Sequence, residues 1–217
     1  MGKKAKGLKK GKGPKAAKRM AKASAGKGLP PYDEAMQYSC EDDPYRGRRK
    51  PVRVEFLALD LKVCDRCQGA DKRVEAAVDR CRDVLGACGY DIDLSITVVA
   101  NEWMAEEYRF YSSPTIRVNG VDICPSIEEN DCGCCSDMSD SPVKCRLYPF
   151  NGTYYEVPPT DMVVQEIMRI ALSGKHADPQ RKPYRLPANF ASFFAGVRRK
   201  TAAQAREGQD CCQPGCC

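Results

Sequence analysis

Two cysteines separated by two residues, Cys64-Asp65-Arg66-Cys67, stand between an apolar run and a helical pattern. The run from Val52 to Leu61 predicts a buried strand, and the apolar spacing from Ala70 to Leu85 predicts an amphipathic helix. This order places Cys64 at a helix N-terminus, where the helix dipole favours the thiolate over the thiol. The chain therefore carries a reactive sulfur, and the second thiol is close enough to form a disulfide or to share a soft metal ion.

A second constraint on the fold is Ser113-Pro114, which is followed by four strand-like residues and the turn Asn119-Gly120. Proline is the residue for which a cis peptide bond costs little, and Asn-Gly is a strong hairpin signal. Between the dithiol and this element the pattern predicts a strand, Ile92 to Val99, and a short helix, Glu102 to Phe110. This alternation of strands and helices predicts an α/β fold, and the resemblance described next implies a small mixed sheet with flanking helices.

With these motifs, residues from about 50 to 172 resemble the thioredoxin/glutaredoxin-like superfamily, and within it a bacterial thioredoxin-like family with extra cysteines. The resemblance implies a thioredoxin-like three-layer sandwich with a cis Pro114 beside the dithiol. In that superfamily the residue before the proline offers its backbone to the substrate as an extra strand. The usual Trp-Cys-Gly-Pro-Cys motif is absent, and the two charged residues between Cys64 and Cys67 act in opposite directions on a thiol, so the redox direction stays open.

Positive charge is concentrated at the start of the chain. Of 35 Lys and Arg residues, eleven lie within residues 1–28, which contain no acidic residue, and this leaves 24 against 29 acidic residues elsewhere. We expect residues 1–28 to be a basic disordered tail and residues 29–50 to be a linker. The tail argues only weakly for nucleic acid contact, because no aromatic residue is interleaved for base stacking. Since no signal peptide and no run of about 20 apolar residues is found, we expect a cytoplasmic protein without a membrane partner.

Fourteen cysteines in such a chain indicate redox chemistry or metal ligation. The predicted domain, residues 51–174, contains a cysteine-rich stretch at 123–145 without periodicity, which predicts an inserted loop. Its candidate zinc or iron–sulfur ligands are Cys132, Cys134, Cys135 and Cys145. The group lacks two well-spaced CxxC pairs, so a structural zinc site and a role as resolving thiols both stay open.

After this stretch the sequence predicts a hairpin around Asn151-Gly152 and then a helix that ends at Gly174. Residues 175–217 form a predicted C-terminal extension with an aromatic cluster, Phe190, Phe193 and Phe194. Two interpretations of the cluster remain, an anchor to the domain surface and a docking segment for a partner.

The extension ends in two cysteine pairs around Pro-Gly, Cys211-Cys212 and Cys216-Cys217. Pro-Gly is typical of a type II turn, which would bring the two pairs together. Neighbouring Cα atoms are about 3.8 Å apart, which is too close for an unstrained disulfide. Four converging thiols therefore predict a chelator for Cu(I), Zn(II), Hg(II) or As(III), with a terminus without function as the alternative.

These motifs favour a thiol-disulfide oxidoreductase that acts on a protein or small-molecule disulfide and carries a tail for soft metals or metalloids. Cys64 would attack as the thiolate, Cys67 would resolve the mixed disulfide, and Pro114 would position the substrate. The competing hypothesis is a metal or metalloid chaperone or scavenger in which the CxxC is a ligand pair. The third hypothesis is a structural zinc protein. The cofactor that the sequence indicates is zinc or another soft ion.

Overall fold

The structure is a computed structural model, and it describes residues 49–124, 126–177 and 183–209. The basic tail, nearly all of the linker and the terminal cysteine pairs lie outside the described residues. The elements, in chain order, are β1 (Lys50–Ala58), α1 (Asp65–Ala87), β2 (Tyr90–Val98), α2 (Glu102–Glu107), β3 (Thr115–Val118), β4 (Val121–Asp122), β5 (Glu128–Asp131), α3 (Gly133–Ser139), β6 (Lys144–Phe150), β7 (Thr153–Tyr155), α4 (Thr160–Ser173) and α5 (Ala188–Gln209).

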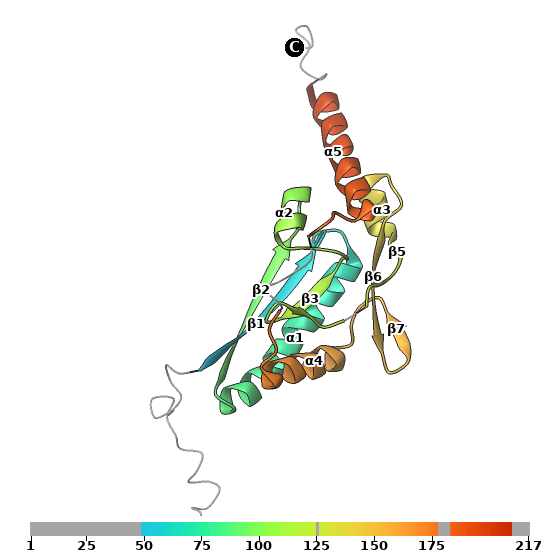
Figure 1. Ribbon diagram of the computed structural model, residues 1–217. Helices are drawn as coiled ribbons and strands as arrows, with labels where there is room; N and C mark the ends of the chain where they lie inside the picture. Colours follow the sequence, from blue (N-terminus) through green and yellow to red (C-terminus); the bar gives the residue numbers. More distant parts are fainter. Residues whose placement is uncertain (1–48, 125, 178–182, 210–217) are drawn as a thin grey trace, which may run out of the picture. The chain divides into compact units, whose positions relative to one another are not determined.

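A four-stranded mixed sheet with the order β2-β1-β3-β4 forms the centre of the fold (Figure 1). β1 pairs in parallel with β2 and antiparallel with β3, and β4 pairs antiparallel with β3. The turn from β3 to β4 uses Asn119 and Gly120, both with positive φ, as a tight hairpin requires. The predicted α/β fold with a small mixed sheet and flanking helices is confirmed.

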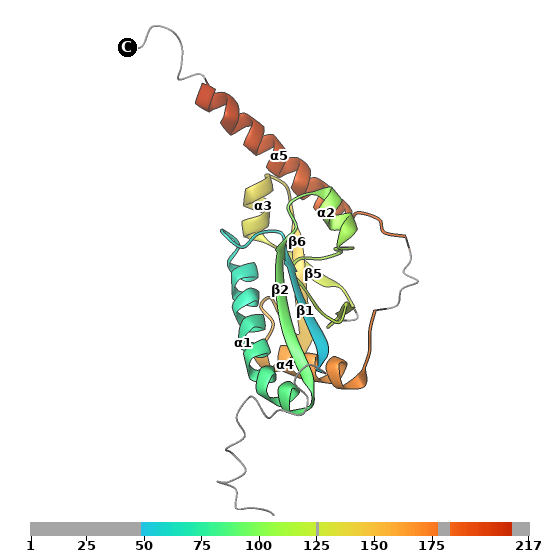
Figure 2. The ribbon, with the colours of Figure 1, turned by 90° about the vertical axis from the view of Figure 1, so that its left-hand side faces the viewer.

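The core lies between this sheet and the helices α1 and α4, which pack along each other (Figure 2). On β1 the alternate residues Val52, Val54 and Phe56 are buried, as expected for one face of a strand. The apolar stripe of α4 is buried as predicted, and the helix ends at Gly174 in the left-handed region.

A second sheet, β5-β6-β7, is inserted between β4 and α4. The hairpin of β6 and β7 was predicted, but the expected loop at 123–145 contains the strand β5 and the helix α3. β5 forms because Glu128–Asp131 pairs antiparallel with β6, from Glu128↔Leu147 to Asp131↔Lys144. Its polar sequence has no strand periodicity, so the pairing cannot be read from the residues alone.

The helix α5 follows in the C-terminal extension and is anchored by the aromatic cluster. Phe190 stacks on Phe110 with ring centroids 4.8 Å apart, and all three phenylalanines of the cluster are buried. At Gly196 the helix touches α3 so closely that an added Cβ would lie 1.8 Å from the carbonyl oxygen of Ser139. Within the described part of the chain, no helix has the length and hydrophobicity to cross a bilayer.

Candidate metal centre

The start of α1 and the start of α3 bring three sulfurs together. Cys64 is the N-cap of α1, Cys132 is the N-cap of α3, and Cys135 lies in the first turn of α3. Their Sγ atoms all lie within 4.8 Å of one another, and the three residues are at most 3 % exposed. Cys145 on β6 adds a fourth buried sulfur, 3.6 Å from the Sγ of Cys135. We call Cys64, Cys132, Cys135 and Cys145 the thiol centre.

The loop before α1 is held by one carboxylate. Oδ1 of Asp60 accepts hydrogen bonds from the backbone N–H groups of Lys62, Val63 and Cys64, at 2.9, 2.6 and 3.0 Å. These bonds close the chain into a tight turn between β1 and α1. The position of Cys64 is therefore fixed by its backbone.

Arg66, inside the CxxC motif, ties α1 to the inserted sheet. Arg66 is 8 % exposed, and its guanidinium donates to Oδ1 of Asn130 at 2.7 Å and pairs with Glu156 at 2.7 Å. Asn130 in turn donates to the same carboxylate at 2.7 Å. Because Asn130 is in β5 and Glu156 follows β7, this network holds the inserted sheet against the start of α1.

Two thiols of the thiol centre are shifted toward the thiolate. Contact with Cys132 opposes ionisation of Cys64, but hydrogen bonds from Cys135 and Cys67 outweigh it and lower the pKa of Cys64 to about 7. The pKa of Cys132 is lowered well below its ordinary range by hydrogen bonds from Cys135, Cys145 and Cys64. The N-terminus of the long helix α1 adds a favourable dipole for Cys64.

The pKa values of the other three thiols are shifted in the opposite direction, toward the protonated form. Contact with Cys132 raises the pKa of both Cys135 and Cys145, and burial adds to each shift. The pKa of Cys67 is raised by its contact with Cys64 and then by burial. The contacts within the ion-free cluster thus favour ionisation of Cys64 and Cys132 and oppose that of Cys67, Cys135 and Cys145. A bound cation would replace protons of these thiols.

The spacing of the sulfurs matches coordination by thiolates. In a tetrahedral zinc site with Zn–S bonds of about 2.3 Å, neighbouring sulfurs lie about 3.8 Å apart. Cys135 and Cys145 are already at 3.6 Å, and the other three sulfur pairs within 4.8 Å need only small rotations of side chains. Cys67 contacts Cys64 and supplies a fifth sulfur beside the thiol centre.

The Ser113–Pro114 peptide bond is cis and lies against the dithiol, as predicted. Oγ of Ser113 is 3.8 Å from Sγ of Cys67 and accepts a hydrogen bond from the N–H of Leu59. The carbonyl of Ser113, which the resemblance would leave for a substrate strand, accepts a 2.7 Å hydrogen bond from the N–H of Arg146 on β6. The hydroxyl of Tyr148, also on β6, donates to the carbonyl of Pro114 at 2.8 Å.

The structure thus joins two groups of cysteines that the sequence left apart. Of the candidate ligands in the insertion, Cys132 and Cys135 meet Cys64, and Cys145 contacts Cys135. Cys134 is half-buried and outside the group. Sequence reasoning missed that Cys132-Gly133-Cys134-Cys135 is itself a CxxC pair that opens a helix, the same signal that singled out Cys64. Cys211, Cys212, Cys216 and Cys217 lie outside the described residues.

Comparison with known families finds a match over this part of the chain. A family model described as a domain of unknown function (DUF2703) matches residues 52–167, which include the whole thiol centre. Neither the curated proteins nor the solved structures contain a significant match.

Proposed function

The chain belongs to the DUF2703 family, and we propose that it binds a soft metal or metalloid ion through Cys64, Cys132, Cys135 and Cys145. The observation that carries this proposal is the meeting of three buried sulfurs within 4.8 Å, with a fourth 3.6 Å from one of them. Ligation of a soft ion by thiolates requires several sulfurs to converge on one point. The sulfurs of two separate CxxC pairs converge in this way in the interior of the domain.

The donor set supports an ion of the soft class. The centre offers only sulfur ligands, and thiolates select Zn(II), Cu(I) and related thiophilic ions over Mg(II) or Ca(II). Four sulfurs suit tetrahedral Zn(II), and three of them suit a three-coordinate ion such as As(III). The N-terminus of α1 offsets part of the negative charge of a multi-thiolate site, and Arg66, although paired with Glu156, favours the thiolate of Cys145.

The surroundings of Pro114 favour an ion over a protein disulfide as the ligand. The carbonyl of Ser113 is already bonded to β6 of the same chain, and Cys64 is completely buried. A substrate strand would have to displace Arg146, whose side chain is buried and paired with Asp122 at 2.8 Å. An ion needs no such displacement.

A titration with Zn(II) and with As(III) under anaerobic conditions tests the proposal. The test protein is the full chain with the four terminal cysteines replaced by serine, so that binding reports the domain alone. We expect one ion per chain and sulfur-only coordination in X-ray absorption, both lost after Cys132→Ser with Cys135→Ser. If the test protein takes up neither ion, or keeps its full affinity without these two sulfurs, the proposal is wrong.

Thiol-disulfide exchange is the second candidate, favoured by the contact between Cys64 and Cys67. In this reaction the Cys64 thiolate attacks a disulfide and releases one thiolate, and Cys67 then attacks the mixed disulfide to release the second. Pro114 would line the dithiol during these steps. Reduction of a small aromatic disulfide that is lost in Cys64→Ser and slowed in Cys67→Ser would support it, whereas equal rates in all three proteins would contradict it.

A further inference from the structure

The outer edge of β2 has no neighbouring strand in the part of the chain that the structure describes. β2 is the first strand in the order β2-β1-β3-β4, and its nine residues pair with β1 on one side only. Figure 2 shows the strand along the open side of the sheet. An unpaired edge presents a row of backbone donors and acceptors to which another strand can add.

The backbone groups on this edge belong to the even-numbered residues of β2. On the inner side the N–H of Val99 donates to the carbonyl of Ala58 at 2.8 Å, so the odd-numbered residues face β1. The carbonyl of Ile92 points outward and accepts a bond of 3.3 Å from the side chain of Arg82. Because this bond is long and Arg82 is more than half exposed, an incoming strand can replace it.

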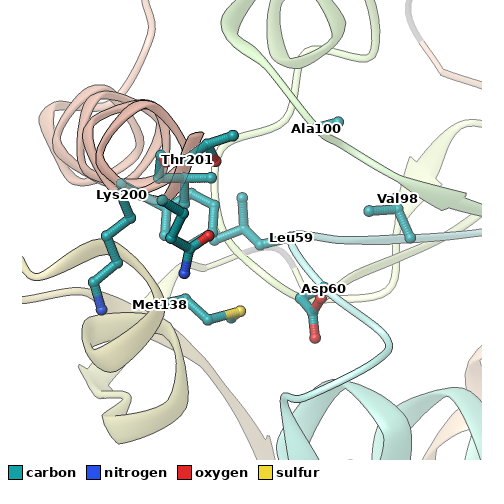
Figure 3. A pocket seen from close by; sticks show the side chains of 10 residues that line it. Leu59, Asp60, Val98, Ala100, Met138, Lys200 and Thr201 are labelled. Carbon is teal, nitrogen blue, oxygen red and sulfur yellow. Dashed lines mark hydrogen bonds between the residues drawn. The ribbon is translucent and has the colours of Figure 1, made fainter. Parts of the chain in front are cut away.

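The apolar face of β2 is incompletely covered by its own chain. Ile96 and Val98 are 41 % and 40 % exposed, and Leu94 is half-buried. Val98 also lines a cavity of about 430 Å³ (Figure 3). A strand added at this edge would cover these side chains with its own apolar face.

The polar face of β2 is asymmetric in charge. Asp91 and Asp93 are exposed in the first half of the strand, whereas Ser95 and Thr97 stand in the second half. If an identical strand adds antiparallel, the first half of one strand meets the second half of the other. Each carboxylate then lies opposite a hydroxyl group, and no charge is placed against its like.

We propose that the partner of this edge is β2 of a second copy of the chain, paired antiparallel about a twofold axis at Leu94. This register pairs all nine residues, with Asp93 opposite Ser95 of the second copy and Ile92 opposite Ile96. Since the outward-facing residues are even-numbered, Leu94 and its copy exchange hydrogen bonds, and the whole seam supplies about ten backbone bonds. A twofold axis at Asp93 or at Ile92 would place carboxylates opposite each other, which destabilises the pairing.

The pairing joins two four-stranded sheets into one continuous sheet. On the apolar face Val98 comes to lie opposite Tyr90 of the second copy, so that this ring covers the exposed valine. The interface is independent of the proposed ion site, because no cysteine of the thiol centre lies in β2. Loss of the dimer therefore leaves ion binding by each chain unchanged.

Sedimentation equilibrium of the full chain tests the proposal, with a reducing agent present to exclude dimers linked by disulfides. Ser95→Lys places a cation opposite Asp93 of the second copy at two symmetric positions, and we expect the dissociation constant of the dimer to fall about tenfold. Ser95→Asp places a carboxylate there and should raise the constant about tenfold. The same two substitutions at Ser192, which is exposed on α5, are the matched controls and should leave it unchanged.

A wild-type chain that is monomeric at every concentration would overturn the proposal. If Ser95→Lys and Ser95→Asp both weaken the dimer, Ser95 lies opposite its own copy and the axis at Leu94 is wrong. If neither substitution changes the dissociation constant, the dimer forms through another surface and the proposal also fails. Thermal unfolding followed by circular dichroism verifies that every variant is folded before it is compared.

Discussion

The two CxxC pairs that build the thiol centre differ in what holds them in place. Cys64 and Cys67 open a helix of 23 residues that packs along α4 and against the central sheet. Cys132 and Cys135 open a helix of seven residues that is held by α5 and by the inserted sheet. The first pair is thus fixed by the core of the domain, and the second by elements added to it. An ion bound to both pairs would cross-link the insertion to the core of the domain.

The largest effect should come from removing a ligand of the second pair. Cys132→Ser removes one of the four sulfurs of the thiol centre. We expect the affinity for Zn(II) to fall by more than about 100-fold, because loss of an outer-shell partner of a metal site already costs about 10-fold to 100-fold. Competition with a chromogenic chelator measures it, in chains with serine at the four terminal cysteines. Cys134→Ser, one residue from Cys135 but outside the centre, is the control. If Cys132→Ser and Cys134→Ser lower the affinity for Zn(II) equally, Cys132 is not a specific ligand of the ion.

The close contact between α3 and α5 should make the insertion sensitive to one methyl group. Gly196→Ala places a Cβ 1.8 Å from the carbonyl of Ser139, and we expect the free energy of unfolding to fall by about 1–3 kcal/mol. Gly86→Ala, in α1, meets only the end of the Arg49 side chain at 3.3 Å and should stabilise the protein by up to about 1 kcal/mol. Urea unfolding measures both changes. A neutral Gly196→Ala would mean that α5 is not fixed on α3.

The link between the two regions can be weakened at Arg66. We expect Arg66→Gln to lower the affinity for Zn(II) by about 10-fold, since outer-shell partners of a metal site act on this scale. Arg80→Gln breaks the exposed pair with Asp161 and should leave the affinity unchanged. If Arg66→Gln binds Zn(II) as tightly as the wild type, the contacts of Arg66 with the inserted sheet do not contribute to ion binding.

The smallest effect is a titration of the first pair in the ion-free protein. The pKa of Cys64 lies at about 7, below its ordinary value of 9.0. Ionisation therefore favours the folded state, and this contribution is complete above about pH 9 and is lost as the pH falls through about 7. The difference in ultraviolet thiolate absorbance between the wild type and Cys64→Ser should have its midpoint near pH 7. A midpoint near 9 would show that the neighbouring thiols do not stabilise this thiolate.

The sequence predicted the central sheet, α1 and α4 because their signals are local. The apolar runs at β1 and β2, the helical spacing after Cys67 and the turn at Asn119 each lie within one element. The thiol centre was predicted only in part, because its members are joined by long-range pairing. β5 is positioned by its pairing with β6 and by the hydrogen bond between Arg66 and Asn130. No local pattern in the sequence indicates either contact. The helix α5 was not predicted, because the sequence analysis identified only its aromatic cluster. The buried rings of this cluster anchor the helix.

The distance in sequence between Cys64 and Cys145 has a consequence for synthesis. About 80 residues separate the first and the last cysteine of the thiol centre. At about 5–20 residues per second, a ribosome exposes the first dithiol about 4–16 seconds before the fourth sulfur emerges. During that interval Cys64 and Cys67 have each other as the nearest thiol, and an oxidant can join them before the other ligands exist. The long separation in sequence therefore leaves the first dithiol open to oxidation until the insertion has been synthesised.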